Sequence, residues 1–279
     1  MAYKSLLTVM TDTVLAQGAL AQMVALADAT DAHADALCLG VDRSQTGYYY
    51  AGANALILQE TLSRANAEAD EVLAFAKDYL GKSGIRWAAE SGVVQIADIS
   101  RHVARRARFS DLVILPRPYG DGRDAEAEPI VEAAMFEGHA PVLLVPDDAT
   151  PFVKPKTVLI GWNESPEAMR AIRRALPFLQ QAEMARIVVI DPPRHGPDRS
   201  DPGGMLSQML ARHGVRCEID VLSKTMTRVS DILSRHATDT EADMIVMGAY
   251  GHSRFREAIL GGATRNMLEQ STVPVFLAH

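Results

Sequence analysis

The residues of this chain best suited to bind a ligand lie near its C-terminus, after the apolar run Met244–Met247. Two glycines separated by two residues are followed by nine residues and then by a cluster of small residues that opens a helical pattern. The set is Gly248, Gly251, Gly261, Gly262, Ala263 and Thr264. A glycine loop lets backbone approach a ligand closely, and a helix start offers N–H groups that favour phosphate. The spacing predicts a phosphate cradle, and glycines that serve only a turn and close packing are the alternative.

The cradle lies in the second of two internal repeats. Asp111–Pro116 matches Asp243–Gly248, and His139–Val145 matches Thr272–Ala278, with offsets of 132 to 133 residues. Between the repeats, residues 147–155 are rich in proline and aspartate and indicate a linker. The chain therefore divides into residues 1–146 and 156–279.

Each repeat alternates short apolar runs with longer helical patterns, which indicates parallel strands joined by crossover helices. Strands are expected near 4–10, 34–41, 85–91, 111–116, 141–145, 156–161, 185–190, 215–222, 243–247 and 273–277. Helices are expected near 14–29, 53–81, 95–108, 127–137, 165–180, 203–213, 228–239 and 263–270. Ligands of such sheets bind outside the carboxyl ends of the strands, where the strand order reverses. The glycine loop follows the carboxyl end of a strand, so it lies in the right place.

The same stretch resembles the universal stress protein family, whose nucleotide-binding members have Gly-x-x-Gly, nine residues and then Gly-Ser/Thr. This chain departs from that pattern at Gly262, which stands where the family has a hydroxyl residue. The resemblance covers essentially the whole chain as two tandem copies. It implies an α/β fold of two doubly wound, five-stranded, Rossmann-like domains that form a pseudo-dimer. The fifth strands, near 142–145 and 273–277, would lie at or near the mutual interface.

The resemblance also implies which residues hold an adenine nucleotide such as ATP, with Mg only as its counter-ion. Asn163 stands where the family has an aspartate that contacts the nucleoside, although an ordinary Asx turn is the alternative. Val189 would meet the adenine through its backbone, and Tyr250 either lines the sugar pocket or packs on the sheet. The phosphates would lie against Gly248, Gly251, Gly261, Gly262, Ala263 and Thr264.

The first repeat lacks an equivalent cradle. After its fourth predicted strand, residues 116–129 carry no Gly-x-x-Gly at the required spacing, and Pro129 contributes no N–H at the expected helix start. Four acidic residues crowd this end and would repel phosphate: Asp121, Asp124, Glu126 and Glu128. We therefore expect the first repeat to have lost triphosphate binding in the family's manner.

Composition narrows the class of protein. The chain has 279 residues, a net charge of -7 and 48% hydrophobic residues, which predicts neither a nucleic-acid nor a membrane partner. Its N-terminus has too short an apolar run for a signal peptide, so we expect a cytoplasmic protein. Cys38 and Cys217 are expected as reduced, buried thiols.

Three functions remain in competition. The first is a stress-response regulator or sensor that binds an adenine nucleotide, with at most slow turnover and pairing of its two domains; a homodimer is compatible with it. The second is an interaction or scaffold module of the same fold that binds no nucleotide. The third, a hydrolase, requires a positioned acid, base or nucleophile, and the sequence offers no convincing one.

Overall fold

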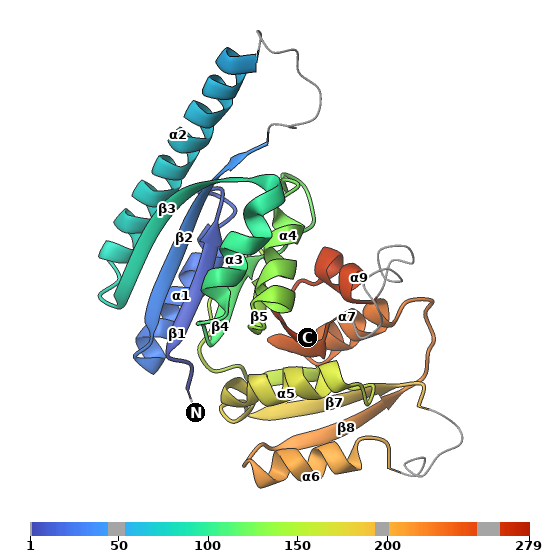
Figure 1. Cartoon of the computed structure of the whole chain (residues 1–279). Coiled ribbons are helices and arrows are strands. Elements are labelled where there is room, and N and C mark those ends of the chain that lie inside the picture. Colours follow the sequence, from blue (N-terminus) through green and yellow to red (C-terminus); the bar gives the residue numbers. More distant parts are fainter. Residues whose placement is uncertain (1, 44–53, 193–200, 250–262) are drawn as a thin grey trace. The chain divides into compact units, whose positions relative to one another are not determined.

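The computed structural model describes residues 2–43, 54–192, 201–249 and 263–279 (Figure 1). They divide into two compact units. The first unit comprises Tyr3–Pro116 and Gly122–Ala140, and the second consists mainly of Arg117–Asp121 and Pro141–His279. Each unit is an α/β structure built around a sheet.

The first unit contains four parallel strands in the order β3-β2-β1-β4. Their bounds are β1 Ser5–Met10, β2 His33–Asp42, β3 Arg86–Gln95 and β4 Leu112–Pro116. The helices are α1 Gln17–Thr30, α2 Asn54–Gly81, α3 Ile99–Ala107 and α4 Ala127–Glu132. A 3-10 turn, η1 Ile96–Asp98, precedes α3, and a π-helical turn, η2 Ala133–Glu137, continues α4. Helix α2 lies along β2 and β3 (Figure 1).

Local packing explains why these residues form this sheet. Leu6 and Val9 of β1 are buried, and the hydroxyl of the buried Thr8 donates to the carbonyl of Ile114 at 2.8 Å. A Cβ on Gly40 of β2 would lie 1.7 Å from the carbonyl oxygen of Ala65. Only glycine therefore allows α2 to cross β2 at this depth.

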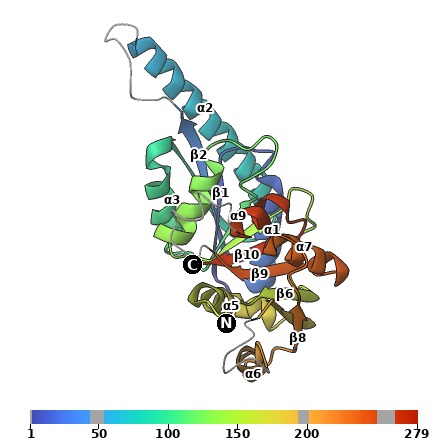
Figure 2. The ribbon, with the colours of Figure 1, turned by 90° about the vertical axis from the view of Figure 1, so that its right-hand side faces the viewer.

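The second unit contains six strands in the order β5-β10-β9-β6-β7-β8. Their bounds are β5 Val142–Val145, β6 Thr157–Gly161, β7 Met184–Ile190, β8 Cys217–Leu222, β9 Met244–Gly248 and β10 Val275–Ala278. The helices are α5 Pro166–Leu179, α6 Gly204–Arg212, α7 Val229–Asp239 and α9 Ala263–Gln270. Figure 2 shows α7 and α9 side by side near β9 and β10.

The expected mixed α/β fold with a large, mostly parallel sheet is confirmed. One strand differs from the expected grouping of five and five, because β5 of the first repeat belongs to the compact unit of the second. It pairs antiparallel with β10, with Leu144 opposite Val275. All residues of both strands are buried, so an unpaired edge here would leave apolar surface and backbone groups uncovered. The fifth strands of the two repeats thus pair directly.

Two predicted boundaries are also adjusted. Strand β3 continues to Gln95, and α3 starts only at Ile99, after the short 3-10 turn. The predicted domain boundary at residue 146 falls just after β5. In the structure, residues 117–121 and all residues from Pro141 on belong to the second compact unit. Antiparallel pairing across the repeats is a long-range contact, which the pattern of apolar runs does not encode.

Candidate functional site

The candidate site of the second unit lies where the strand order reverses, between β9 and β6. Gly161 at the end of β6 is in register with Met247 of β9 and with Val188 of β7. Three predicted site residues follow directly: Asn163, Val189 and Gly248. The structure therefore brings these three to one carboxyl edge, on strands that neighbour each other at the usual spacing of about 4.8 Å.

Asn163 forms the Asx turn that we considered as the alternative to ligand contact. Its Oδ1 accepts a hydrogen bond from the backbone N–H of Ser165 at 3.2 Å. Ser165 then caps α5, because its Oγ accepts from the N–H of Ala168 at 3.1 Å and Pro166 fills the first helical position. The Asn163 side chain is exposed, so it lies at the rim with one oxygen engaged in local structure.

Gly248 is required by packing. A Cβ at this residue would lie 2.4 Å from the backbone nitrogen of Ala168 and 2.7 Å from the carbonyl carbon of Glu167. Real Cβ atoms do not approach backbone so closely, so the first turn of α5 presses directly on the end of β9. Of the two readings of the glycines, close helix–sheet packing therefore accounts for Gly248.

Val189 also has a structural role. Its side chain is 7% exposed, and a Cβ on Gly203 would lie 3.6 Å from its Cγ2. Gly203 has a φ of 95° and precedes α6, so the entry to this helix packs over Val189. The backbone of Val189 remains one residue from the carboxyl end of β7, where the family resemblance places its contact.

The start of α9 is another place for an anion at this edge. At the start of α5, Pro166 has no N–H, the N–H of Ala168 is capped, and the N–H of Met169 donates to the carbonyl of Ser165 at 3.1 Å. Helix α9 begins at Ala263, directly after the predicted glycine pair, and Thr264 in its first turn is 4% exposed. The other predicted cradle residues, Tyr250, Gly251, Gly261 and Gly262, lie outside the described residues.

The C-terminal residue, which sequence reasoning missed, fixes the chain just after Gly248. The N–H of Ala249 donates to the carbonyl of Ala278 at 3.0 Å, and the carbonyl of Ala249 lies 3.0 Å from Nδ1 of His279. These contacts continue the pairing of β9 with β10 by one residue. Only the position of His279 directly after a strand hints at this role in the sequence.

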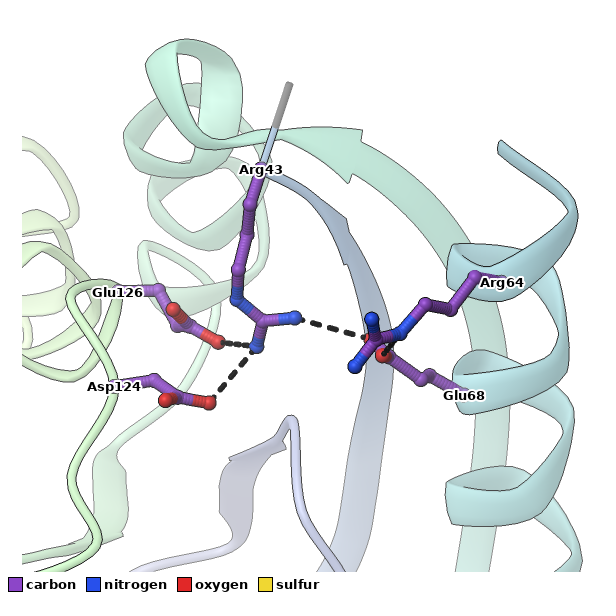
Figure 3. A network of polar contacts seen from close by, with 5 residues as sticks. All are labelled: Arg43, Arg64, Glu68, Asp124 and Glu126. Carbon is purple, nitrogen blue, oxygen red and sulfur yellow. Dashed lines mark hydrogen bonds and ion pairs between the residues drawn. The ribbon is translucent and has the colours of Figure 1, made fainter. Parts of the chain in front are cut away.

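The corresponding edge of the first unit is occupied by charged side chains (Figure 3). Arg43, after β2, forms ion pairs with Glu126, with Asp124 at 2.9 Å and with Glu68 at 3.2 Å. Burial acts to lower the pKa of Arg43, but the hydrogen bond and charge of Glu126 and the charges of Asp124 and Glu68 outweigh it and raise the pKa above its usual value. Glu126 is 1% exposed and directly precedes α4.

This cluster gives the acidic residues a role that the sequence did not reveal. Asp124 and Glu126 were expected to repel phosphate, and they do stand at the start of α4. They are held there by Arg43, which follows β2. The guanidinium of Arg43 is thereby committed to carboxylates. Pro129 lies in the first turn of α4, as expected.

A second charged cluster lies on β7, β8 and α7. Nη1 of Arg186 contacts both carboxylate oxygens of Asp220 at 3.0 Å, and Nε2 of His236 lies 2.8 Å from Oδ2. Burial acts to raise the pKa of Asp220, but these hydrogen bonds and the positive charges outweigh it and lower the pKa below 3.8. Asp220 is therefore ionised at neutral pH, which suits a structural anchor better than a general acid.

The cysteines differ from each other. Cys38 is fully buried, and this burial is the main reason why the pKa of its thiol is raised to about 11. The charge of Lys77 lowers the pKa and that of Glu90 raises it, both to a lesser extent. Cys217 is half-buried, with its Sγ 3.5 Å from the hydroxyl of Ser207. Both thiols are free. The expectation of a buried site is confirmed for Cys38 and corrected for Cys217, which lies on β8 at the edge of the sheet.

Neither a metal site nor a membrane span is found in the part of the chain that the structure describes. There, His, Cys, Asp and Glu side chains nowhere gather in a group of three or more suited to a metal ion. Within the same residues, every helix is too short or too polar to cross a bilayer.

Comparison with known proteins identifies the second repeat. Residues 154–279 match the model of the Universal stress protein family. A universal stress protein of Synechocystis sp. is 29% identical over 72 residues, and this match spans 26% of the chain and only 24% of the relative.

Solved structures extend the likeness to the whole chain. A universal stress protein from Archaeoglobus fulgidus is 14% identical, and the superposition covers 98% of this chain and 96% of that one with a TM-score of 0.72. A functionally unknown protein from Pseudomonas aeruginosa is also 14% identical. Its superposition covers 99% of this chain and 92% of that protein's chain, with a TM-score of 0.57. At these identities the likeness is one of fold. Residues 154–279 therefore belong to the universal stress protein family, and the whole chain has a tandem two-domain fold that a solved member of this family shares.

Proposed function

We propose that this protein is a cytoplasmic regulator or sensor that binds one adenine nucleotide, ATP or a close relative, in its second half. The observation that carries the proposal is the convergence at one edge of the second unit. The strand order reverses between β9 and β6, and the end of β7 and the start of α9 lie at the same edge. The family resemblance assigns the nucleoside and the phosphates to these strand ends.

The contrast between the two helix starts supports an anion at α9. The start of α5 has Pro166 at its first position and two N–H groups bonded to Ser165, whereas α9 begins directly after two glycines and has Ala263 and Thr264 in its first turn. A helix start with small residues attracts phosphate through its N–H groups and its dipole. We therefore assign the phosphates to the start of α9 and to the glycines Gly251, Gly261 and Gly262, and the adenine to the backbone beside Val189.

Slow or absent turnover is part of the proposal. Among the described residues of the second unit, the pair Asp220 and His236 is tied to Arg186 in an ion-pair cluster. Mg enters the proposal only as a counter-ion of the bound nucleotide. Binding and release of nucleotide, read by a partner or by the rest of the chain, then constitute the signal.

Co-purified ligand provides the first test of the proposal. Protein purified without added nucleotide is heat-denatured, and the supernatant is separated by chromatography with detection at the absorbance of adenine. We expect an adenine nucleotide at up to one equivalent per chain. If neither released nucleotide nor calorimetric binding of ATP at millimolar concentration is detected, the proposal is wrong.

Substitution of Gly251 provides the second test. Gly251→Asp should abolish binding, because the new side chain blocks backbone approach and adds like charge beside phosphate. Gly81→Asp is the matched control, since a Cβ at Gly81 meets no atom within 4 Å and the residue lies in the first unit. Equal loss of binding in both variants would contradict the assignment to the second half.

A scaffold module that binds no nucleotide is the second candidate, and one observation favours it. Gly248 is explained by packing against α5 alone, and Gly262 lacks the hydroxyl that nucleotide-binding relatives offer. In that case Gly251→Asp would change neither ligand content nor ATP titration, and the protein would be found in complexes without any nucleotide.

A further inference from the structure

The segment after β4 of the first repeat crosses into the second compact unit. Arg117–Asp121 clusters with the residues of the second half. By the repeat offset, Pro116 corresponds to Gly248, so this segment occupies the position of the predicted glycine loop. Here Pro116 stands in the place of Gly248 and Tyr119 in the place of Gly251, with Arg117 and Pro118 between them. Pro118 is buried and Tyr119 half-buried, so the segment is packed in place.

Arg117 holds the C-terminal end of α9. Its Nη1 donates to the carbonyl of Ser271, the residue after the helix, at 3.1 Å, and its Nη2 lies 3.9 Å from a carboxylate oxygen of Asp147. Ser271 is 1% exposed, and its hydroxyl donates to the carbonyl of Val273 at 2.6 Å. Carbonyls at a helix end lack intrahelical donors and carry partial negative charge, so a guanidinium there is favourable.

Tyr119 holds the other end of the same helix. The guanidinium carbon of Arg265, in the first turn of α9, lies 4.9 Å from the centroid of the Tyr119 ring. Nε of Arg265 also donates to Glu269 at 3.0 Å, one turn further along. A cation over an aromatic face is attracted to the ring, and more strongly when water is partly excluded. The tyrosine therefore fixes the side of the helix next to its N-terminal turn.

External contacts matter because α9 is short. It has eight residues, and a helix of this length is not stable by itself. Its buried side rests on α7, where the hydroxyl of Ser234 lies 3.6 Å from Sδ of Met267. The Arg117–Tyr119 segment adds one contact at each end. An anion site at a helix start requires that the start be held to within about 0.5 Å.

We propose that Arg117 and Tyr119 are positioning residues for the anion site of the second half. The segment after β4, which in the first repeat has no glycine cradle, contacts both ends of α9 and so fixes this helix. We call this pair of contacts the clamp on α9. Neither residue touches the ligand; both act through α9. The ligand part of this inference rests on the proposed function, whereas the hold on α9 does not.

Hydrogen exchange of the full-length protein tests the hold on α9 without any ligand. Peptides covering residues 263–270 are followed by mass spectrometry in Tyr119→Leu, Arg117→Met and the control Arg235→Met. Arg235 lies on α7, and its side chain is 69% exposed. It forms an ion pair with Asp239, one turn along the same helix. We expect exchange in α9 to be about five- to tenfold faster in the first two variants and unchanged in the control. Unchanged exchange in Tyr119→Leu and Arg117→Met would overturn the clamp.

Nucleotide affinity and a conservative replacement test the positioning role. Tyr119→Leu should weaken ATP binding by about tenfold in calorimetric titration, whereas Tyr119→Phe keeps the ring and should restore both affinity and the slow exchange of α9. Faster exchange in Tyr119→Leu with unchanged affinity would overturn the positioning role. If the wild-type protein binds no nucleotide, the proposed function and the positioning role fail together, and the hold on α9 is still decided by exchange.

Discussion

In the first unit, the carboxyl edge of the sheet carries Arg43 and three carboxylates from two segments, whereas in the second unit the edge between β6 and β9 carries glycine, backbone and a helix start. The two edges descend from matching positions of the repeat. The first edge is filled by an internal ion-pair cluster, whereas at the second we propose that a bound nucleotide supplies the charge. The difference shows that two repeats of one fold can keep the same sheet and place different groups at its carboxyl edge.

The same contrast extends to the residues after the fourth strand of each repeat. In the second repeat this stretch of sequence carries the glycines of the predicted cradle, and in the first it carries Arg117 and Tyr119, which contact α9. Single substitutions test this difference.

The largest effect is expected at Gly248. Gly248→Ala places a methyl group 2.4 Å from the backbone nitrogen of Ala168, and relief requires α5 to move, so the free energy of unfolding should fall by about 3 kcal/mol. Gly161→Ala is the matched control on the neighbouring strand, because its nearest contact would be an ordinary 3.5 Å from Cβ of Met247. Urea unfolding followed by circular dichroism measures both. Equal stability of the two variants would contradict the packing role of Gly248.

A gain of affinity is expected at Gly262. Gly262→Ser supplies the hydroxyl that the family pattern has, and a hydrogen bond to a charged group contributes about 1.5–3 kcal/mol. ATP should therefore bind roughly ten- to hundredfold more tightly, provided that the backbone accepts a side chain. Calorimetric titration of both forms decides this, and weaker binding by the serine variant would refute the assigned phosphate contact.

In the first unit, Arg43→Met should lower the free energy of unfolding by about 2 kcal/mol, because it leaves the buried carboxylate of Glu126 without its cation. The double variant Arg43→Met/Glu126→Met should recover much of this loss, since no buried charge remains unpaired. Nucleotide affinity should stay at the wild-type value in both. A changed affinity would show that the edges of the two units are not independent.

The smallest effect concerns acid stability of the second unit. Asp220 has a lowered pKa in the folded protein, so its contribution is fully present above its unfolded pKa of about 3.9 and is lost as pH falls through the lower folded pKa. Asp220→Asn should therefore cost about 1 kcal/mol at pH 7, and this cost should shrink as pH falls through the folded pKa of Asp220. In the first repeat, the corresponding pair of Glu90 and Arg106 is about half exposed, so Glu90→Gln should cost less at pH 7. A larger change in Glu90→Gln would reverse this part of the comparison.

The sequence predicted the fold class because the apolar runs and helical patterns are local signals. The helix expected near 165–180 is α5, and Ser-Pro-Glu at residues 165–167 is a local signal for its start, where Ser165 is the cap. The resemblance placed the fifth strands at or near the mutual interface, but the antiparallel register of β5 with β10 and the ion pairs of Arg43 were not predicted, because they join residues far apart in the chain. Arg43 lies 83 residues from Glu126, and no short motif links them.

Asn163, Val189 and Gly248 lie at one edge of the sheet, as the sequence predicted, and the structure gives each of them a local role. Asn163 and Gly248 were selected by their places in a family pattern, and the structure gives both a local task, an Asx turn and contact with α5. A single glycine can satisfy packing and ligand approach alike, so its residue type does not separate the two. Distances to neighbouring backbone do separate them, which is why Gly248 could be resolved only by the structure.

The stoichiometry of nucleotide binding tests the asymmetry of the two halves most directly. Calorimetric titration of ligand-free, full-length protein with ATP in the presence of Mg²⁺ gives the number of sites per chain. We predict one site per chain, lost in Gly251→Asp and retained in Arg43→Met. Two sites per chain, or one site that survives in Gly251→Asp and disappears in Arg43→Met, would contradict the account.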